Sequence, residues 1–415
     1  MSQISLIFFF LAVSLLLSIL TSRGVSLLKS PLLLGYIIAG AVIGIVIDLV
    51  IPASSPGQFR VDDFEIINIV TLALIGFGIG TELEYKELKK VGKMVLWITI
   101  FEASLTFIFV STVVSLLLHF AMGWDTNVAI SLGLLFGSFA SATAPAGTVD
   151  VIKQYKASGS LVTTLYAVLG LDDIFALLIF TITLPISIMI LSASSTLTIS
   201  SALMSSIWEI LISISIGSLI GYGLAYFGKK VHEKFMVNYL ALGSVFLMCG
   251  LAEKFHLSPI LINMFAGIVA VNKSKLIAFK INHALTEWSP PIYVWFFVLI
   301  GTRLDIGLIQ QYWILIIVYI ISTMIGKYNG AYLGAVVSKA PAKIRKYLGF
   351  TLLSQAGVAI GLSMAASKYL VEAGHPEEAK LVTSVMTMTT FLIMMIAPNL
   401  VKYGLIKSGE AKLTK

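Results

Sequence analysis

The sequence predicts an all-α polytopic membrane protein with thirteen transmembrane helices. Of its 415 residues, 58% are hydrophobic and 12% are charged, against about 25% charged in an ordinary soluble domain. Apolar runs recur from residue 4 to residue 405, and most approach the roughly 20 residues that a helix needs to cross hydrocarbon. A soluble enzyme and a nucleic-acid-binding domain are therefore excluded. The single cysteine, Cys249, excludes a disulfide scaffold.

Thirteen apolar segments follow one another with short polar connections. We expect helices at residues 4–20, 31–50, 64–81, 94–118, 127–152, 160–192, 206–228, 236–253, 258–272, 288–309, 311–338, 347–367 and 381–401. No basic residue precedes the first segment, so we expect a mature helix there rather than a cleaved signal peptide.

The positions of Lys and Arg predict the orientation in the membrane. The loops joining helices 1–2, 3–4, 5–6, 7–8, 9–10 and 11–12, together with the C-terminal tail, hold 22 of them, and the alternate loops hold 5. Positive charge accumulates on the cytoplasmic side. We therefore expect the N-terminus outside and the C-terminus in the cytoplasm. This placement accounts for the net charge of +7 without a nucleic-acid partner.

Three of the predicted helices carry ionisable residues in mid-span, where a charge costs roughly 2.5–3.5 kcal/mol and marks function. The sixth helix has Asp172 and Asp173, the eleventh has Lys327 and the fourth has Glu102. Adjacent residues of a helix point about 100° apart. One aspartate can therefore face Lys327 while the other faces a cavity. A pair that only fixed helix packing would leave the second aspartate unexplained.

The chemistry of these groups favours ion exchange. Two adjacent carboxylates at low dielectric resist double ionisation and titrate as a coupled unit. Their charge can be relieved by a proton, by Lys327 or by an alkali cation, which prefers oxygen ligands. If proton and cation compete for the same oxygens, and the site faces the two sides in turn, exchange transport follows. Glu102 is either a third titrating group or a polar support, or it has a purely structural role.

Two of the predicted helices are interrupted. The fifth contains GSFASATAPAG, with Ser141, Thr143 and Pro145, and the twelfth contains TLLSQAGVAIGLS, with Gln355. Proline removes a backbone donor and disfavours helix at the preceding residue. Matching interruptions in two halves point to a transporter's binding site, although small residues also serve close helix packing. We expect two inverted six-helix repeats, with residues 206–228 as the linker.

Together these features resemble the bacterial and archaeal sodium/proton antiporters of the monovalent cation:proton antiporter superfamily, in its two-aspartate branch. The resemblance is carried by Asp172–Asp173, by Lys327 and by the breaks at Thr143–Pro145 and Gln355–Gly357. Further matching stretches are SPLLLGYIIAGAVIG (30–44), IGFGIGTELEYKELK (75–89) and VWFFVLIGTRLDIGL (294–308). Departures are Ala144, where some relatives have an acidic residue, and the lack of a glutamate near Gly357.

The resemblance implies a single integral-membrane unit, residues 1–415, that forms a homodimer in a prokaryotic cell membrane among its lipids. Residues 1–90 and 206–309 would be the dimerisation scaffold. Residues 94–192 and 311–405 would be the core, whose crossed broken helices move as an elevator. No cofactor and no soluble regulatory domain are expected.

The resemblance also implies roles for single residues. Asp173 would be the principal carboxylate for Na⁺ and H⁺, with Asp172 as the second Na⁺ ligand. Asp172 would pair with Lys327 and release it when sodium binds, and Thr143 would lie beside the ion. Residues that would support the site are Ser141, Glu102 and Gln355.

The expected activity is exchange of Na⁺ or Li⁺ for H⁺, and the resemblance implies that it is electrogenic, with more protons than cations moved per cycle. Potassium/proton exchange by the same residues is the alternative. An intramembrane aspartyl protease would need two aspartates from different helices, and a channel would conduct without proton coupling. We therefore expect a transporter and not an enzyme.

Overall fold

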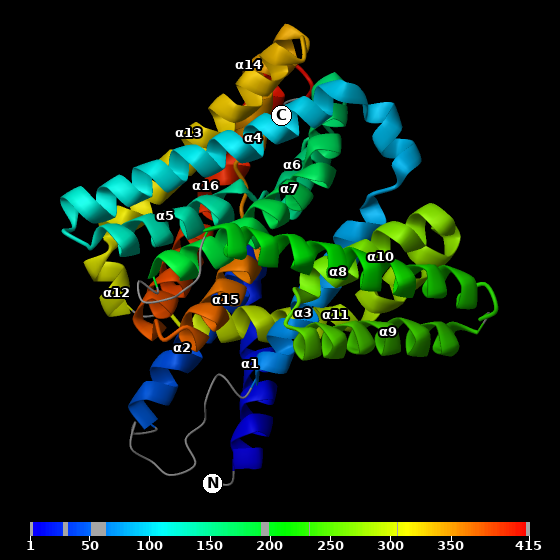
Figure 1. The fold of residues 1–415 in the computed structure, drawn as a ribbon, viewed down its shortest axis with the longest axis horizontal. Helices are drawn as coiled ribbons and strands as arrows, with labels where there is room; N and C mark the ends of the chain where they lie inside the picture. Colours follow the sequence, from blue (N-terminus) through cyan, green and yellow to red (C-terminus); the bar gives the residue numbers. More distant parts are fainter. Residues whose placement is uncertain are drawn as a thin grey trace. The chain divides into compact units, whose positions relative to one another are not determined.

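The computed structural model describes residues 3–27, 32–50, 64–191, 199–231, 233–304 and 306–411. These residues form helices with short connections, and no strand occurs among them (Figure 1). The predicted all-α class is confirmed. Four of the basic residues used to predict the orientation, Lys29, Arg60, Lys412 and Lys415, lie outside the described residues.

Many of the helices suit a membrane. Eight in the described ranges are long and apolar enough to cross one, at Ser5–Val25, Glu65–Glu82, Gly92–Ala121, Ser160–Leu191, Ile207–Phe227, Lys234–Phe255, Trp313–Val337 and Pro376–Lys407. Shorter apolar helices lie at Leu32–Ile47, Thr126–Ser141 and Pro259–Lys273. Large apolar side chains such as Phe8 and Leu219 are 68% and 73% exposed, as expected of a surface that faces lipid. The count of thirteen spans stays a prediction.

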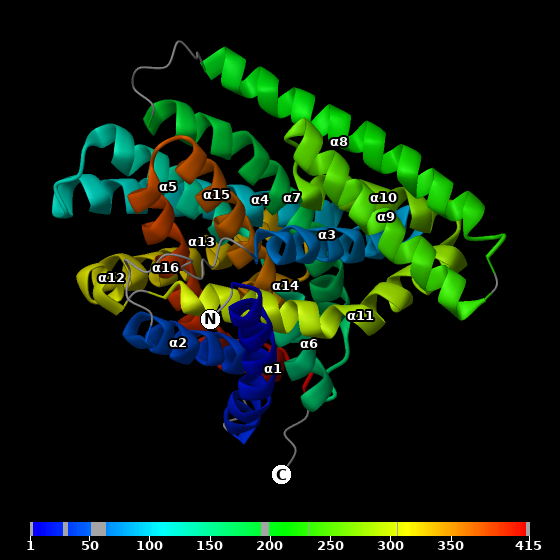
Figure 2. The ribbon, with the colours of Figure 1, turned by 90° about the horizontal axis from the view of Figure 1, so that it is seen from below.

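The chain divides into two compact units, of which the first is Met1–Glu84 with Glu209–Leu304. Its helices are α1 (Gln3–Leu27), α2 (Leu32–Val50), α3 (Glu65–Glu82), most of α8 (Ile199–Phe227), α9 (Lys234–Phe255), α10 (Pro259–Lys273) and α11 (Lys275–Thr302). Helix α2 packs on α11, and α3 packs on α10 (Figure 2). Glycine allows the α2–α11 approach, because a Cβ on Gly40 would lie 2.1 Å from the carbonyl oxygen of Val298.

The second unit is Tyr85–Trp208 with Asp305–Lys415. Its elements are α4 (Tyr85–Leu116), the π-helical turn η2 (Leu117–Ala121), α5 (Thr126–Ser141), α6 (Pro145–Gln154), α7 (Ser160–Leu191), α12 (Ile306–Gln311), α13 (Trp313–Val337), α14 (Ala342–Thr351), α15 (Gly357–Glu372) and α16 (Pro376–Lys407).

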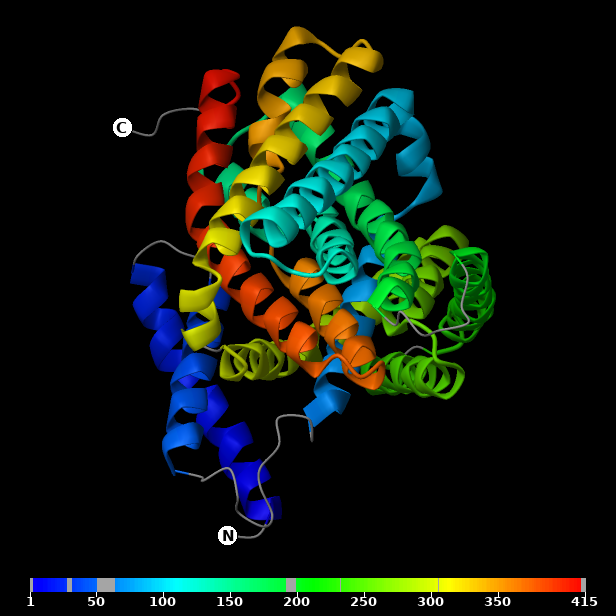
Figure 3. The ribbon, with the colours of Figure 1, turned by 60° about the vertical axis from the view of Figure 1, so that its left-hand side comes forward.

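The same succession of elements occurs twice in the second unit: a long helix, then a broken helix, then a second long helix. The first set is α4, α5 with α6, and α7; the second is α13, α14 with α15, and α16. Helix α4 lies along α13 (Figure 1), and α15 lies along α16 (Figure 3). The two broken helices thus occupy matching positions in the two sets. The inverted six-helix repeat stays a prediction.

The largest differences from the predicted helix boundaries are in α4 and α11. Helix α4 begins at Tyr85 rather than 94, with an interruption at Gly92, whose φ of 76° suits glycine. Helix α11 covers Lys275–Thr302 rather than 288–309. Its first half is amphipathic: Ile277, Ile281 and neighbouring apolar residues are buried, while Lys275 and Lys280 are exposed. A half-polar helix escapes a search for apolar runs but is stabilised by packing of its apolar face.

The chain beyond α16 returns to the start of α7. The Glu410 carboxylate accepts hydrogen bonds from the backbone nitrogens of Leu161 (2.9 Å) and Val162 (3.0 Å) and from Ser160 Oγ (3.3 Å). Lys343 Nζ, at the start of α14, donates to it at 3.2 Å. Burial alone would raise the pKa of Glu410, but these donors outweigh burial and lower that pKa below its ordinary 4.5. Glu410 therefore caps α7, since free N–H groups at a helix N-terminus favour negative charge.

We predict that Glu410→Gln destabilises the protein by about 1 kcal/mol at neutral pH, because the capping charge is lost. A carboxyl with a lowered folded pKa stabilises fully above its ordinary pKa and stops doing so as the pH falls through the folded value. The difference from wild type should therefore shrink below pH 4.5. Thermal unfolding in detergent as a function of pH measures it. The control is exposed Glu372→Gln, and an equal loss in that variant would contradict the capping role.

Candidate functional site

The break in the first broken helix lies between Ser141, which ends α5, and Pro145, which begins α6. Proline at a helix start needs no N–H donor and pushes the preceding residue out of the helical region. The backbone at Ala142 is extended, with φ −71° and ψ 143°. The freed N–H of Ala144 donates to the carbonyl oxygen of Ser354 at 2.7 Å. The break predicted from Thr143–Pro145 is therefore present and is covered by the second broken helix.

The second break separates α14 from α15 and contacts the first. Gln355 Nε2 donates to the carbonyl oxygens of Phe139 (3.2 Å) and Ala140 (3.3 Å), in the last turn of α5. On the other side, Thr148 Oγ1 donates to the carbonyl oxygen of Thr351 at 3.2 Å. Each break thus supplies partners for the backbone groups of the other. Irregular backbone at membrane depth requires such partners, because hydrocarbon offers none.

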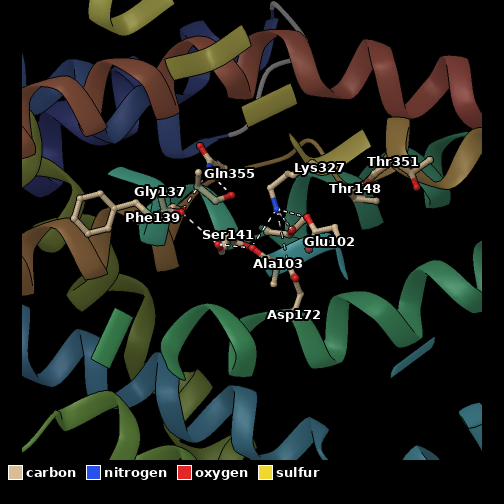
Figure 4. Close-up of polar contacts among 12 residues, drawn as sticks. Glu102, Ala103, Gly137, Phe139, Ser141, Thr148, Asp172, Lys327, Thr351 and Gln355 are labelled. Carbon is tan, nitrogen blue, oxygen red and sulfur yellow. Dashed lines mark hydrogen bonds and ion pairs between the residues drawn. The ribbon is translucent and has the colours of Figure 1, made fainter. Parts of the chain in front are cut away.

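Lys327 lies beside this crossing (Figure 4). Its Nζ donates to Glu102 Oε1 at 2.7 Å, to Thr143 Oγ1 at 2.7 Å and to the carbonyl oxygen of Ser141 at 3.2 Å. The side chains of Lys327 and Glu102 are fully buried. An ammonium group has three donors, so these contacts use all of them. The donation to Ser141 also places positive charge at the C-terminal end of α5, where the helix dipole favours it.

The two aspartates lie on α7. Asp172 Oδ2 is 3.8 Å from Lys327 Nζ, which is an ion-pair distance but too long for a hydrogen bond. Asp172 is fully buried, and Asp173 is 4% exposed. Within the described ranges, neither carboxylate oxygen of Asp172 accepts a hydrogen bond. Figure 4 shows Asp172 pointing towards the group formed by Lys327 and Glu102.

The fold thus brings together residues distant in sequence. Asp172, Lys327, Thr143, Ser141 and Glu102 meet at one point, and a hydrogen bond from Ser141 Oγ to the Ala103 carbonyl (3.0 Å) ties α5 to α4. Gln355 lies at the crossing itself and contacts the α5 carbonyls rather than Lys327.

Two features of the site were not predicted from the sequence. The carboxylate nearest to Lys327 is Glu102, because α4 and α13 approach very closely: a Cβ on Gly330 would lie 2.7 Å from Glu102 Cα. The four-residue spacing of Gly326, Gly330 and Gly334 could have indicated this contact. The second is Tyr319, a fully buried residue whose hydroxyl contacts Gln355. Its spacing of eight residues from Lys327 puts both on one face of α13.

Two half-helix pairs that meet beside buried charges, within a protein of many apolar helices, are the arrangement typical of a secondary transporter. The sequence model of the transmembrane sodium/hydrogen exchanger family matches residues 11–402. The chain belongs to this family, and its resemblance to monovalent cation:proton antiporters is confirmed. The family consists of ion transporters rather than enzymes. The two-aspartate branch stays a prediction.

Single relatives are distant but cover most of the chain. The chain is 22% identical over 349 residues to a Na⁺/H⁺ antiporter of Enterococcus hirae. The matched region covers 83% of this chain and 84% of that protein. The structure of the sodium proton antiporter MjNhaP1 from Methanocaldococcus jannaschii at pH 8 has a TM-score of 0.77 and 17% identity, over 98% of this chain and 99% of the other. An electron-microscopy structure of the same antiporter has a TM-score of 0.75 and 17% identity, over 99% of both chains. These likenesses show that the fold is shared.

We predict that Gly330→Ala destabilises the protein by about 1–3 kcal/mol, because the new methyl group must push α4 from α13. Thermal unfolding in detergent measures the loss. The matched control is Gly250→Ala in α9, where a Cβ meets nothing within 4 Å; there helix propensity favours alanine by up to about 1 kcal/mol. Equal effects of the two substitutions would argue against the close approach.

Proposed function

We propose that the protein exchanges Na⁺ or Li⁺ for H⁺ across a prokaryotic cell membrane. The observation that carries the proposal is the buried Asp172 carboxylate, 3.8 Å from the Lys327 ammonium and next to Asp173, at the crossing of two broken helices. The family and the antiporter of Enterococcus hirae support the same activity. Oxygen ligands of this kind suit a hard alkali cation.

In the proposed cycle, Asp173 and Asp172 supply carboxylate oxygens to the cation, and Thr143 lies beside the ion in the break. Protons compete for the same oxygens, so binding of one ligand expels the other. The nearby positive charge of Lys327 reduces the repulsion between two ionised aspartates at low dielectric. Exchange follows when the loaded site opens to each side in turn.

The two units suggest how the site moves. Both broken helices, both aspartates and Lys327 belong to the second unit, which we assign as the mobile core. The first unit then serves as the scaffold and the dimerisation surface of a homodimer. Alternating access is an elevator movement of the core, with the N-terminus outside and the C-terminus in the cytoplasm.

The main test is Na⁺-driven proton movement in proteoliposomes. An imposed sodium gradient should move protons in wild type, and Asp173→Ala should abolish the movement, because the principal exchange carboxylate is gone. Asp125→Asn is the matched control, since Asp125 caps the start of α5 through a side-chain oxygen that asparagine retains. Full exchange in Asp173→Ala would refute the proposal.

A cation series in the same assay separates sodium from potassium exchange. Potassium/proton antiport by the same residues is the alternative, and it would give proton movement with K⁺ but little with Na⁺ or Li⁺.

We predict that exchange is electrogenic, because two aspartates can carry more protons than the single charge of the cation that they bind. An imposed membrane potential, clamped with valinomycin where potassium itself is not transported, should change the initial rate at fixed ion gradients. A rate that is indifferent to voltage would indicate one-for-one exchange.

A further inference from the structure

The hydrogen bonds that the Lys327 ammonium donates affect how it contacts the aspartates. Glu102, Thr143 and the Ser141 carbonyl accept the three hydrogen bonds that the ammonium can donate, at 2.7, 2.7 and 3.2 Å. Asp172 is the more distant carboxylate, at 3.8 Å. Its contact with Lys327 is therefore electrostatic only, and its oxygens are not occupied by the lysine.

The Glu102–Lys327 pair is held by the backbone and not by a flexible side chain alone. The three glycines of α13 face α4 one turn apart: Cβ atoms on Gly326, Gly330 and Gly334 would lie 2.9, 2.7 and 2.6 Å from the Cα atoms of Thr106, Glu102 and Ile98. Both helices are continuous here, unlike the interrupted segment that carries Thr143. Glu102 is therefore a fixed neighbour of Lys327.

The need of buried charges for a partner also supports a lasting Glu102–Lys327 pair. A fully buried charge is strongly destabilising unless it has a partner, and Lys327 and Glu102 are both fully buried. Their opposite charges cancel at hydrogen-bonding distance. The Asp172 carboxylate, 3.8 Å from Lys327 Nζ and with no hydrogen bond among the described residues, is then the group that attracts a cation.

We propose that Glu102 is the permanent counter-charge and positioning residue of Lys327, which leaves Asp172 available as a cation ligand. This inference rests on the proposed antiport function and deepens it. In this arrangement Glu102 does not touch the cation. It sets cation affinity by keeping Lys327 from capturing Asp172.

The test is Glu102→Gln in purified full-length protein. Without its counter-charge, Lys327 should be drawn to Asp172 and should remove that carboxylate from the cation site. We expect the Na⁺ concentration for half-maximal exchange to rise about tenfold, since breaking a buried pair leaves a charge that must find another partner. The Na⁺-dependent increase in melting temperature should require correspondingly more sodium, because a ligand stabilises in proportion to its occupancy.

Three further variants show whether the effect is one of charge. Glu102→Asp keeps the charge and should restore Na⁺ dependence towards wild type. The double variant Glu102→Gln with Lys327→Gln removes both charges and should need less sodium than Glu102→Gln alone, which a double-mutant cycle quantifies. Thr106→Val, one turn along α4 and also buried against α13, should leave the Na⁺ midpoint unchanged.

Two results would overturn the inference. One is a Glu102→Gln protein that melts at a lower temperature but keeps the wild-type Na⁺ midpoint, which would make Glu102 a packing residue only. The other is a double variant that needs as much sodium as Glu102→Gln. Failure of the antiport proposal is seen separately, as full exchange in Asp173→Ala, whatever the result at Glu102.

Discussion

The second unit depends on the mutual satisfaction of two broken helices. A chain cannot leave helical geometry inside hydrocarbon unless its backbone groups find partners. Here the Ala144 N–H is satisfied by Ser354, and the carbonyls at the end of α5 are satisfied by Gln355 and Lys327. The breaks lie about 200 residues apart in sequence, yet each supplies hydrogen-bond partners to the other. Their crossing brings Thr143 and the Ser141 carbonyl to Lys327.

The crossing of the broken helices lies beside the buried charged residues of the site. Two acidic side chains pair with Lys327, and the distances rank them, with Glu102 at 2.7 Å and Asp172 at 3.8 Å. In the proposed arrangement the Glu102–Lys327 pair keeps its place while Asp172 exchanges cation and proton. Glu102 lies on the continuous part of α4 that packs against α13, whereas Thr143 lies in the break between α5 and α6.

Most of the fold could be predicted from local patterns, because the membrane enforces them. Long apolar runs, the Pro145 break and the polar run around Gln355 can each be read from one continuous stretch of sequence, and the structure has helices or breaks at most of these places. The start of α11 could not be predicted in this way. Its Lys275 and Lys280 face outward while Ile277 and Ile281 enter the core, so the helix is stabilised by packing with α9 that no local run of residues reveals.

For the site, the amino-acid sequence alone identifies four residues that are costly to bury in a membrane: Asp172, Asp173, Lys327 and Glu102. It does not show which of the three acids Lys327 contacts, because nothing in the local sequence distinguishes them. That contact is set by the packing of the helices. The glycines of α13 let its backbone approach α4 more closely than any side chain would allow. That contact places Glu102 within hydrogen-bonding distance of Lys327, at 2.7 Å, while Asp172 lies farther away, at 3.8 Å.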